Sequence, residues 1–144
     1  MQRITIRNLT RRRPLTEKTI RGLVKRVLKL EGVSGYGLSI TLVSDARIKR
    51  LNRRYFKKNR STDVIAFSAQ EGKQIAGTDK FLGDMVISLD AAERQAQIFK
   101  STPKEEFKLY LIHGVLHLLG YDDLTKAGFK RMSRRQAELL KRAG

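Results

Sequence analysis

The chain has 144 residues, 40% of them hydrophobic, so it is long enough to bury the core of one globular domain. It contains no cysteine, which excludes disulfides and thiolate metal sites, and no apolar run of about 18 residues that could cross a membrane. Lysine and arginine outnumber the acids by 31 to 14, and the net charge of +17 favours nucleic acid as the partner over an anionic membrane or plain solubility.

Strands and helices alternate in the first half of the chain. Residues 1–13 lack the apolar stretch of a secretory signal, which fits a cytoplasmic protein. Apolar residues alternate in the strand segments and recur every three or four positions in the helical ones. Thr16 and Ser44 are typical N-cap residues. These signals predict strands at 2–7 and 38–43, helices at 16–29 and 45–55, and glycine-rich or basic connections at 32–37 and 57–61.

The second half of the chain continues the alternation. Asp90 is the predicted cap of one helix, and Thr102-Pro103 with Glu105 resembles a capping box with proline at the first helical position. The segment 69–80 is polar, contains glycine and is predicted to be mobile. We predict strands at 63–68 and 83–89 and helices at 90–100, 103–119 and 125–142. The whole pattern predicts one α+β domain over residues 1–144, with about four strands in a mixed sheet and about five helices.

Both histidines of the chain, His113 and His117, lie four residues apart within a predicted helix. Residues at i and i+4 share one face of a helix, with β-carbons about 5–6 Å apart, so two imidazoles at this spacing can hold one metal ion. Gly120 can end the helix in a left-handed conformation, and the chain can then return the carboxylate of Asp123 to the same ion. The pattern predicts a metal site, on a zincin-like helix, with the ligands His113, His117 and Asp123.

This ligand set leaves an open coordination position, as catalytic zinc sites do, although it also suits manganese, nickel or iron. The alternative is that the histidines are core or interface residues and Asp123 caps the last helix. Asp122 is the competing carboxylate, interpreted as a turn residue or as the group that orients a histidine. Zincin proteases carry a glutamate base after the first histidine, whereas this chain has Gly114, so the site lacks the protease base.

Three blocks of sequence carry a family resemblance. The first block consists of Leu51-Asn52, Tyr55 and residues 62–67. The second block is residues 82–88, and the third is residues 113–123. Through these blocks the chain resembles, over most of its length, the YbeY family of bacterial metal-dependent single-strand endoribonucleases and rRNA maturation factors. The resemblance implies a small α+β fold and a zinc ion near a basic cleft. It also implies cleavage of single-stranded RNA, not DNA, at the ribosome, including small-subunit rRNA 3′-end maturation and ribosome quality control.

The chain departs from the family pattern at two positions. Asp123 stands where the family has a third histidine ligand, which keeps a metal site but changes its donors. Phe56 stands where the family has an arginine, which we expect to contact phosphate. Four nearby cations are predicted to supply that charge and to bind the RNA: Arg54, Lys57, Lys58 and Arg60.

The residues predicted to take part in catalysis are His113, His117 and Lys58. Because the position after His113 supplies no base, the attacking oxygen belongs to a metal-activated water or to the 2′-hydroxyl of the RNA, and the sequence leaves both open. Three aromatic residues are candidates for base stacking, with a core role as the alternative for the two tyrosines: Tyr55, Phe56 and Tyr121.

Two other function classes stay open at this point. The first is a non-catalytic rRNA- or ribosome-binding assembly factor with a structural metal. The departures from the family pattern at Phe56 and Asp123 leave this function open. The second is a peptidase built on the zincin-like helix, against which both Gly114 and the net charge argue. The basic C-terminal helix at 125–142 is either a solvated face or a surface that docks on the ribosome.

Overall fold

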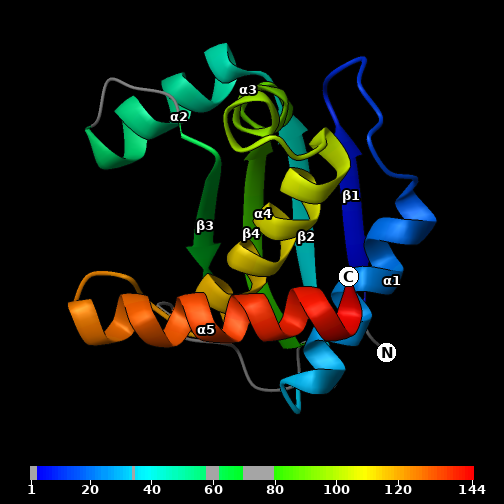
Figure 1. The fold of residues 1–144 in the computed structure, drawn as a ribbon, viewed down its shortest axis with the longest axis vertical. Coiled ribbons are helices and arrows are strands. Elements are labelled where there is room, and N and C mark those ends of the chain that lie inside the picture. The colour runs from blue at the N-terminus through cyan, green and yellow to red at the C-terminus, as the bar shows by residue number, and fades with distance from the viewer. Residues whose placement is uncertain (1–2, 34, 58–61, 70–79) are drawn as a thin grey trace.

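Figure 1 shows a computed structural model of the chain, which describes residues 3–33, 35–57, 62–69 and 80–144. The fold is α+β, and the described residues form the predicted four strands and five helices. The strands are β1 (Ile4–Asn8), β2 (Tyr36–Val43), β3 (Val64–Ser68) and β4 (Lys80–Ser88). The helices are α1 (Glu17–Leu30), α2 (Asp45–Phe56), α3 (Leu89–Phe99), α4 (Pro103–Leu118) and α5 (Lys126–Ala143).

The four strands form one mixed sheet in the order β1-β2-β4-β3. β1, β2 and β4 run parallel, whereas β3 pairs antiparallel with β4 at the edge of the sheet. Parallel neighbours need a crossover connection, which α1 supplies between β1 and β2. The antiparallel edge strand β3 contacts α4, so the edge of the sheet and the histidine-bearing helix adjoin.

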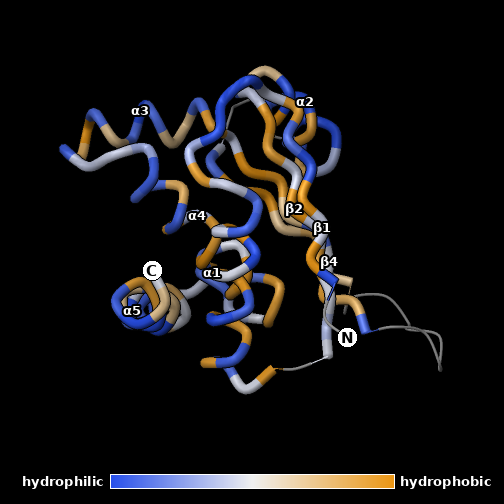
Figure 2. The backbone as a smooth tube through the Cα atoms, turned by 90° about the vertical axis from the view of Figure 1, so that its right-hand side faces the viewer, coloured by the Kyte–Doolittle hydropathy of each residue, from blue (hydrophilic) through white to orange (hydrophobic). Residues whose placement is uncertain are grey.

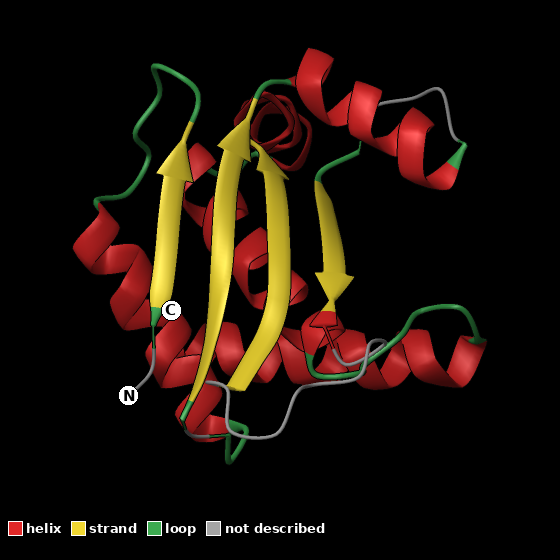
Figure 3. Cartoon of the chain, turned by 180° about the vertical axis from the view of Figure 1, so that it is seen from behind, coloured by secondary structure: helices red, strands yellow, loops and turns green. Residues whose placement is uncertain are grey.

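The helices α1, α4 and α5 lie on one side of the sheet, as the side view in Figure 2 shows. Seen from behind in Figure 3, the strands stand in front of these helices. α4 contacts β3, β4, α1, α3 and α5, and this central position explains why its sequence is apolar almost all round. Its fully buried side chains include Phe107, Leu111, Ile112 and Val115.

A second, smaller core lies on the opposite face of the sheet. There α2 packs across one end of the strands, near β3 in Figure 3. The cluster consists of Val43, Ile48, Ile65 and Val86, with Leu51 and Phe67 packed against it. This packing fixes the last turn of α2 beside the edge strand, where it forms one wall of the cleft described below.

The boundaries differ from the prediction at several places. α3 begins at Leu89 with Ser88 as its N-cap, so the prediction of Asp90 as the cap was wrong. The Asp90 carboxylate instead accepts a hydrogen bond from the Asp45 amide and pairs with Arg12. β2 and β4 begin earlier than predicted because Tyr36 and Lys80 extend their parallel pairing.

Two predictions fall partly on undescribed positions. Most of the segment 69–80, predicted to be mobile, and most of the basic connection 57–61 lie outside the described residues. None of the helices in the described part of the chain is long and apolar enough to cross a membrane.

Candidate metal centre and adjoining cleft

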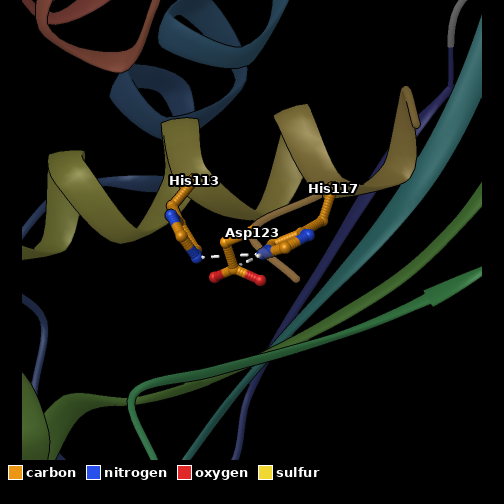
Figure 4. Close-up of side chains that lie close together, drawn as sticks. All are labelled: His113, His117 and Asp123. Atoms are coloured by element: carbon orange, nitrogen blue, oxygen red, sulfur yellow. Dashed lines mark hydrogen bonds and ion pairs between the residues drawn. The ribbon is translucent and has the colours of Figure 1, made fainter. Parts of the chain in front are cut away.

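Three side chains converge at the C-terminal end of α4, as Figure 4 shows. His113 and His117 come from successive turns of the helix, and Asp123 comes from the turn that follows it. The two Nε2 atoms are 3.0 Å apart, and the Nε2 of His117 lies 3.9 Å from a carboxylate oxygen of Asp123. One donor atom from each residue lies within 4.8 Å of the others. The structure thus brings together the three ligands that the sequence predicts.

The hydrogen bonds of the two rings fix which nitrogen carries hydrogen. The Nδ1 of His117 lies 3.1 Å from the carbonyl oxygen of Tyr121, which can only accept, so Nδ1 is the donor. The Nδ1 of His113 lies 2.7 Å from the Oε1 of Gln136 and donates to it in the same way. Both Nε2 atoms therefore present lone pairs to each other. A shared cation would stabilise this arrangement, and at an N–metal distance of about 2.0–2.1 Å one zinc ion could reach both.

The ring partners were not identified from the sequence. Asp122, the residue proposed to orient a histidine, has its carboxylate bonded to the Leu124 amide and acts as a turn residue. The orienting group is Gln136, which lies on α5 between the buried residues Met132 and Leu139. A polar residue within an apolar helical stripe needs a hydrogen-bond partner. The position of Gln136 in such a stripe was the feature of the sequence that could have identified it.

The sequence after α4 explains how Asp123 returns to the helix. α4 ends at Leu118, and Gly120 has a φ of 101°, which a residue with a β-carbon adopts only with strain. The Tyr121 amide then donates to the Leu116 carbonyl, so the chain folds back along the last turn. This confirms the role predicted for Gly120.

A partly buried polar network holds this turn against the C-terminal end of α1. The Tyr121 hydroxyl donates to the Glu31 carboxylate at 3.3 Å, and the Arg135 guanidinium binds the same carboxylate at 3.0 Å. Arg135 also donates to the Leu30 carbonyl. The carboxylate raises the pKa of Arg135, while burial and then Glu31 raise the pKa of Tyr121. The network ties α1 and α5 to the turn that carries Asp123, here called the ligand turn. Tyr121 therefore helps to position this turn.

Burial lowers the pKa of His117, and the adjacent His113 lowers it further, while Asp123 opposes the change. The imidazole of His117 therefore keeps its neutral form to a lower pH than an exposed histidine. Neutral imidazole is the form that binds metal ions, so the surroundings of His117 favour its use as a ligand.

Gly114 is required by packing. A β-carbon at this position would lie 2.2 Å from the Sδ of Met85, which is fully buried on β4, and 3.3 Å from a methyl group of Val64. The position after the first histidine thus faces the sheet rather than the three ligands. A glutamate base cannot occupy it, which is the physical reason that the zincin protease arrangement does not fit this chain.

A cleft of about 860 Å³ adjoins the three ligands. One wall contains His117 and the turn from Gly120 to Asp123, and the other contains β3 and the last turn of α2. The second wall is aromatic, with Tyr55 and Phe56 from α2 packed on Phe67 from β3. None of the described residues that line the cleft is a lysine or an arginine. The resemblance implied a basic cleft, whereas the described walls are not basic.

A model of the YbeY family, described as "Endoribonuclease YbeY", matches residues 5–144 of the chain. The chain belongs to the YbeY family. A relative named Endoribonuclease YbeY from Bacillus mycoides is 39% identical over 132 residues, which cover 87% of this chain and 85% of the relative. Another of that name, from Syntrophotalea carbinolica, is 35% identical over 144 residues, which cover 99% of this chain and 96% of the relative.

A solved structure supports the fold. The solution structure of TM1509 from Thermotoga maritima matches with a TM-score of 0.65 and 24% sequence identity, covering 96% of this chain and 87% of that protein. At this identity the likeness shows the fold alone.

Two of the four cations predicted to bind RNA in this YbeY chain, Arg54 and Lys57, lie beside the cleft rather than in its described walls. Arg54 and Lys57 are exposed at the C-terminal end of α2, and the Arg54 guanidinium lies 5.5 Å from the centre of the Tyr55 ring. Lys57 has a left-handed backbone and ends the helix. Lys58 and Arg60 lie outside the described residues. Phe56, at the position where the resemblance implies an arginine, lies in the aromatic wall instead of contributing charge.

Proposed function

We propose that the protein is a metal-dependent, single-strand-specific endoribonuclease that acts in rRNA maturation, including that of the small-subunit 3′ end, and in ribosome quality control. The observation that most directly supports this proposal is the pair of Nε2 atoms that face each other beside Asp123 at the edge of a cleft. Membership of a family whose model is described as an endoribonuclease supports cleavage of RNA, and the net charge of +17 supports a polyanionic substrate.

His113, His117 and Asp123 are the proposed metal ligands. Nitrogen and carboxylate donors suit zinc, and the single carboxylate also suits a harder divalent metal such as manganese. When bound, the ion supplies Lewis-acid chemistry to the scissile phosphate and its nucleophile. Within the chain, Gln136 and the Tyr121 carbonyl accept the Nδ1 hydrogens of the two histidines, so the two Nε2 atoms stay turned toward each other.

The RNA is proposed to lie in the cleft, with its phosphates bound by cations at the rim. Arg54 and Lys57 project from the end of α2, and we assign Lys58 and Arg60 to the same role from the sequence. Lys58 is also kept as a catalytic candidate. The packing of Gly114 leaves no general base beside His113, so the attacking oxygen is that of water or of the 2′-hydroxyl. A substrate with one deoxynucleotide at the cleaved linkage distinguishes them, because it resists attack by the 2′-hydroxyl.

The test is cleavage of a short labelled single-stranded RNA by the wild-type protein and by His117→Ala, purified in parallel and checked for fold by circular dichroism. We expect the substitution to abolish cleavage and to reduce the bound metal. Equal cleavage by both proteins would reject the metal-site nuclease and indicate a contaminant.

A second candidate is a non-catalytic assembly factor that binds rRNA and uses the metal structurally. The lack of lysine and arginine among the described residues of the cleft wall favours it, because cleavage sites for RNA commonly hold cations near the phosphate. Tight RNA binding without cleavage, by metal-loaded protein on rRNA fragments as well as on short RNA, would support this function over the first.

A further inference from the structure

Two large aromatic side chains are exposed at the end of α2. The side chain of Tyr55 is 55% exposed and that of Phe56 is 47% exposed, although the sequence made Tyr55 a candidate for the core. Adjacent exposed rings beside a cleft indicate a contact surface more strongly than scattered apolar residues do. Two other exposed phenylalanines, Phe99 and Phe129, do not line the cleft.

Phe67 holds both rings in place. Its ring centre lies 5.4 Å from that of Tyr55 in an edge-on arrangement and 5.9 Å from that of Phe56 in a nearly parallel one. Phe67 itself belongs to β3 and packs against the smaller core. The rings are therefore ordered before any ligand binds, which lowers the entropy lost on binding.

The surroundings of these rings match a nucleotide. The rings line the same cleft as His117 and Asp123, so a ligand on them reaches the candidate metal centre. Exposed Arg54 and Lys57 flank them and can bind phosphate while the rings contact a base. Aromatic side chains stack on any base whose face is open, whereas paired bases within a duplex are covered on both faces.

We propose that Tyr55 and Phe56 form a platform on which one unpaired base of the RNA stacks next to the candidate metal centre. The proposal rests on the proposed function for the identity of the ligand, and it assigns the preference for single strands to these two rings. Phe56 makes this contribution in place of the phosphate contact expected of the family arginine.

The test measures binding rather than cleavage, so it stands even if the protein cuts no RNA. All proteins carry His117→Ala, and fluorescence anisotropy reports the Kd for a labelled single-stranded RNA. We expect Phe56→Ala to raise the Kd about 5- to 100-fold, the loss equivalent to one base–aromatic stack. Phe56→Trp retains binding, and the matched control Phe99→Ala leaves the Kd unchanged. A fully paired RNA is bound equally well with and without Phe56.

An abasic scan locates the stacked base by changing the RNA instead of the protein. One base is removed at each position in turn, and we expect a single position to account for the main loss of affinity. At that position the loss should vanish in the Phe56→Ala protein, because the two changes remove the same contact. Equal effects of Phe56→Ala and Phe99→Ala, or an abasic loss that persists in Phe56→Ala, would overturn the proposal.

Discussion

The orientation of the His113 ring depends on one amide from another helix. Gln136 on α5 accepts from the Nδ1 of His113 at 2.7 Å, and this bond leaves Nε2 free to bind a cation. His117 has a backbone carbonyl in the equivalent role, which substitution does not remove. The side chain of Gln136 is therefore the ring partner that mutation can address.

We expect Gln136→Leu to weaken metal binding by about 10- to 100-fold, the usual effect of losing a group that orients a ligand. Gln136→Glu keeps an acceptor and should bind the metal nearly as well as the wild type. Titration against a chelator of known affinity measures the change. The control is Gln97→Leu on the exposed face of α3, and a loss of affinity there as well would contradict the assigned role.

The close packing of α4 at Gly114 can be tested by adding a β-carbon there. Its missing β-carbon lets α4 approach Met85, so Gly114→Ala should destabilise the fold by about 1–3 kcal/mol through overpacking. Gly22 lies within α1, where an added β-carbon meets only the Nη1 of Arg26, at 3.2 Å, which is a milder contact than the one at Gly114. Gly22→Ala should be neutral or stabilise by up to about 1 kcal/mol through helix propensity. Urea unfolding measures both, and equal effects would reject the packing argument.

At the scale of elements, α5 carries the positive charge that the described cleft walls lack. Lys126, Lys130 and Arg134 are exposed at spacings of four residues, so they form one stripe along the helix. The opposite side of α5 is buried through Met132, Leu139 and Ala143. With its apolar side buried against the core, the helix has no wide apolar face for a membrane, which favours RNA as the partner of this stripe.

Replacing all three stripe residues by glutamine should weaken binding of single-stranded RNA and reduce the slope of log K against log salt by about 2, since each phosphate contact contributes about 0.7. The matched control replaces three exposed lysines of α1, Lys18, Lys25 and Lys29, and removes the same charge elsewhere. If both triple variants lose affinity equally, the effect comes from net charge and α5 is not a docking surface.

The elements differ in how far their sequence determines them. α1 was predictable because its apolar stripe and its Thr16 cap agree. The start of α3 was missed because Ser88 and Asp90 are both good caps, and the choice depends on a tertiary bond between Asp90 and the Asp45 amide. The candidate ligands His113, His117 and Asp123 follow from local spacing along the chain. Gln136, which comes from a distant helix, required the packing of α5 against α4 to be known.

At the scale of the whole molecule, the candidate metal centre joins the end of α4, the following turn and α5. A ligand that binds the folded state and not the unfolded one stabilises the fold, by about 2.7 kcal/mol when its free concentration is 100 times the Kd. Metal binding should therefore be visible in the global unfolding transition.

We expect zinc to raise the Tm of the wild-type protein by several degrees and a chelator to reverse the change. His117→Ala should show a Tm that does not respond to zinc. Differential scanning fluorimetry with zinc, manganese and magnesium ranks the metals in the same experiment. A Tm increase that persists in His117→Ala would place the stabilising ion elsewhere.

The contact between Glu31 and Arg135 has a consequence for genetics. Both side chains are largely buried, with 12% and 21% of their surfaces exposed, and they hold the ligand turn through Tyr121 although neither lines the cleft. A heat-sensitive allele arises where a substitution weakens a support that low temperature still maintains. A screen for conditional alleles of this gene should therefore recover changes at Glu31 and Arg135, whereas changes at the candidate metal ligands should be null at every temperature.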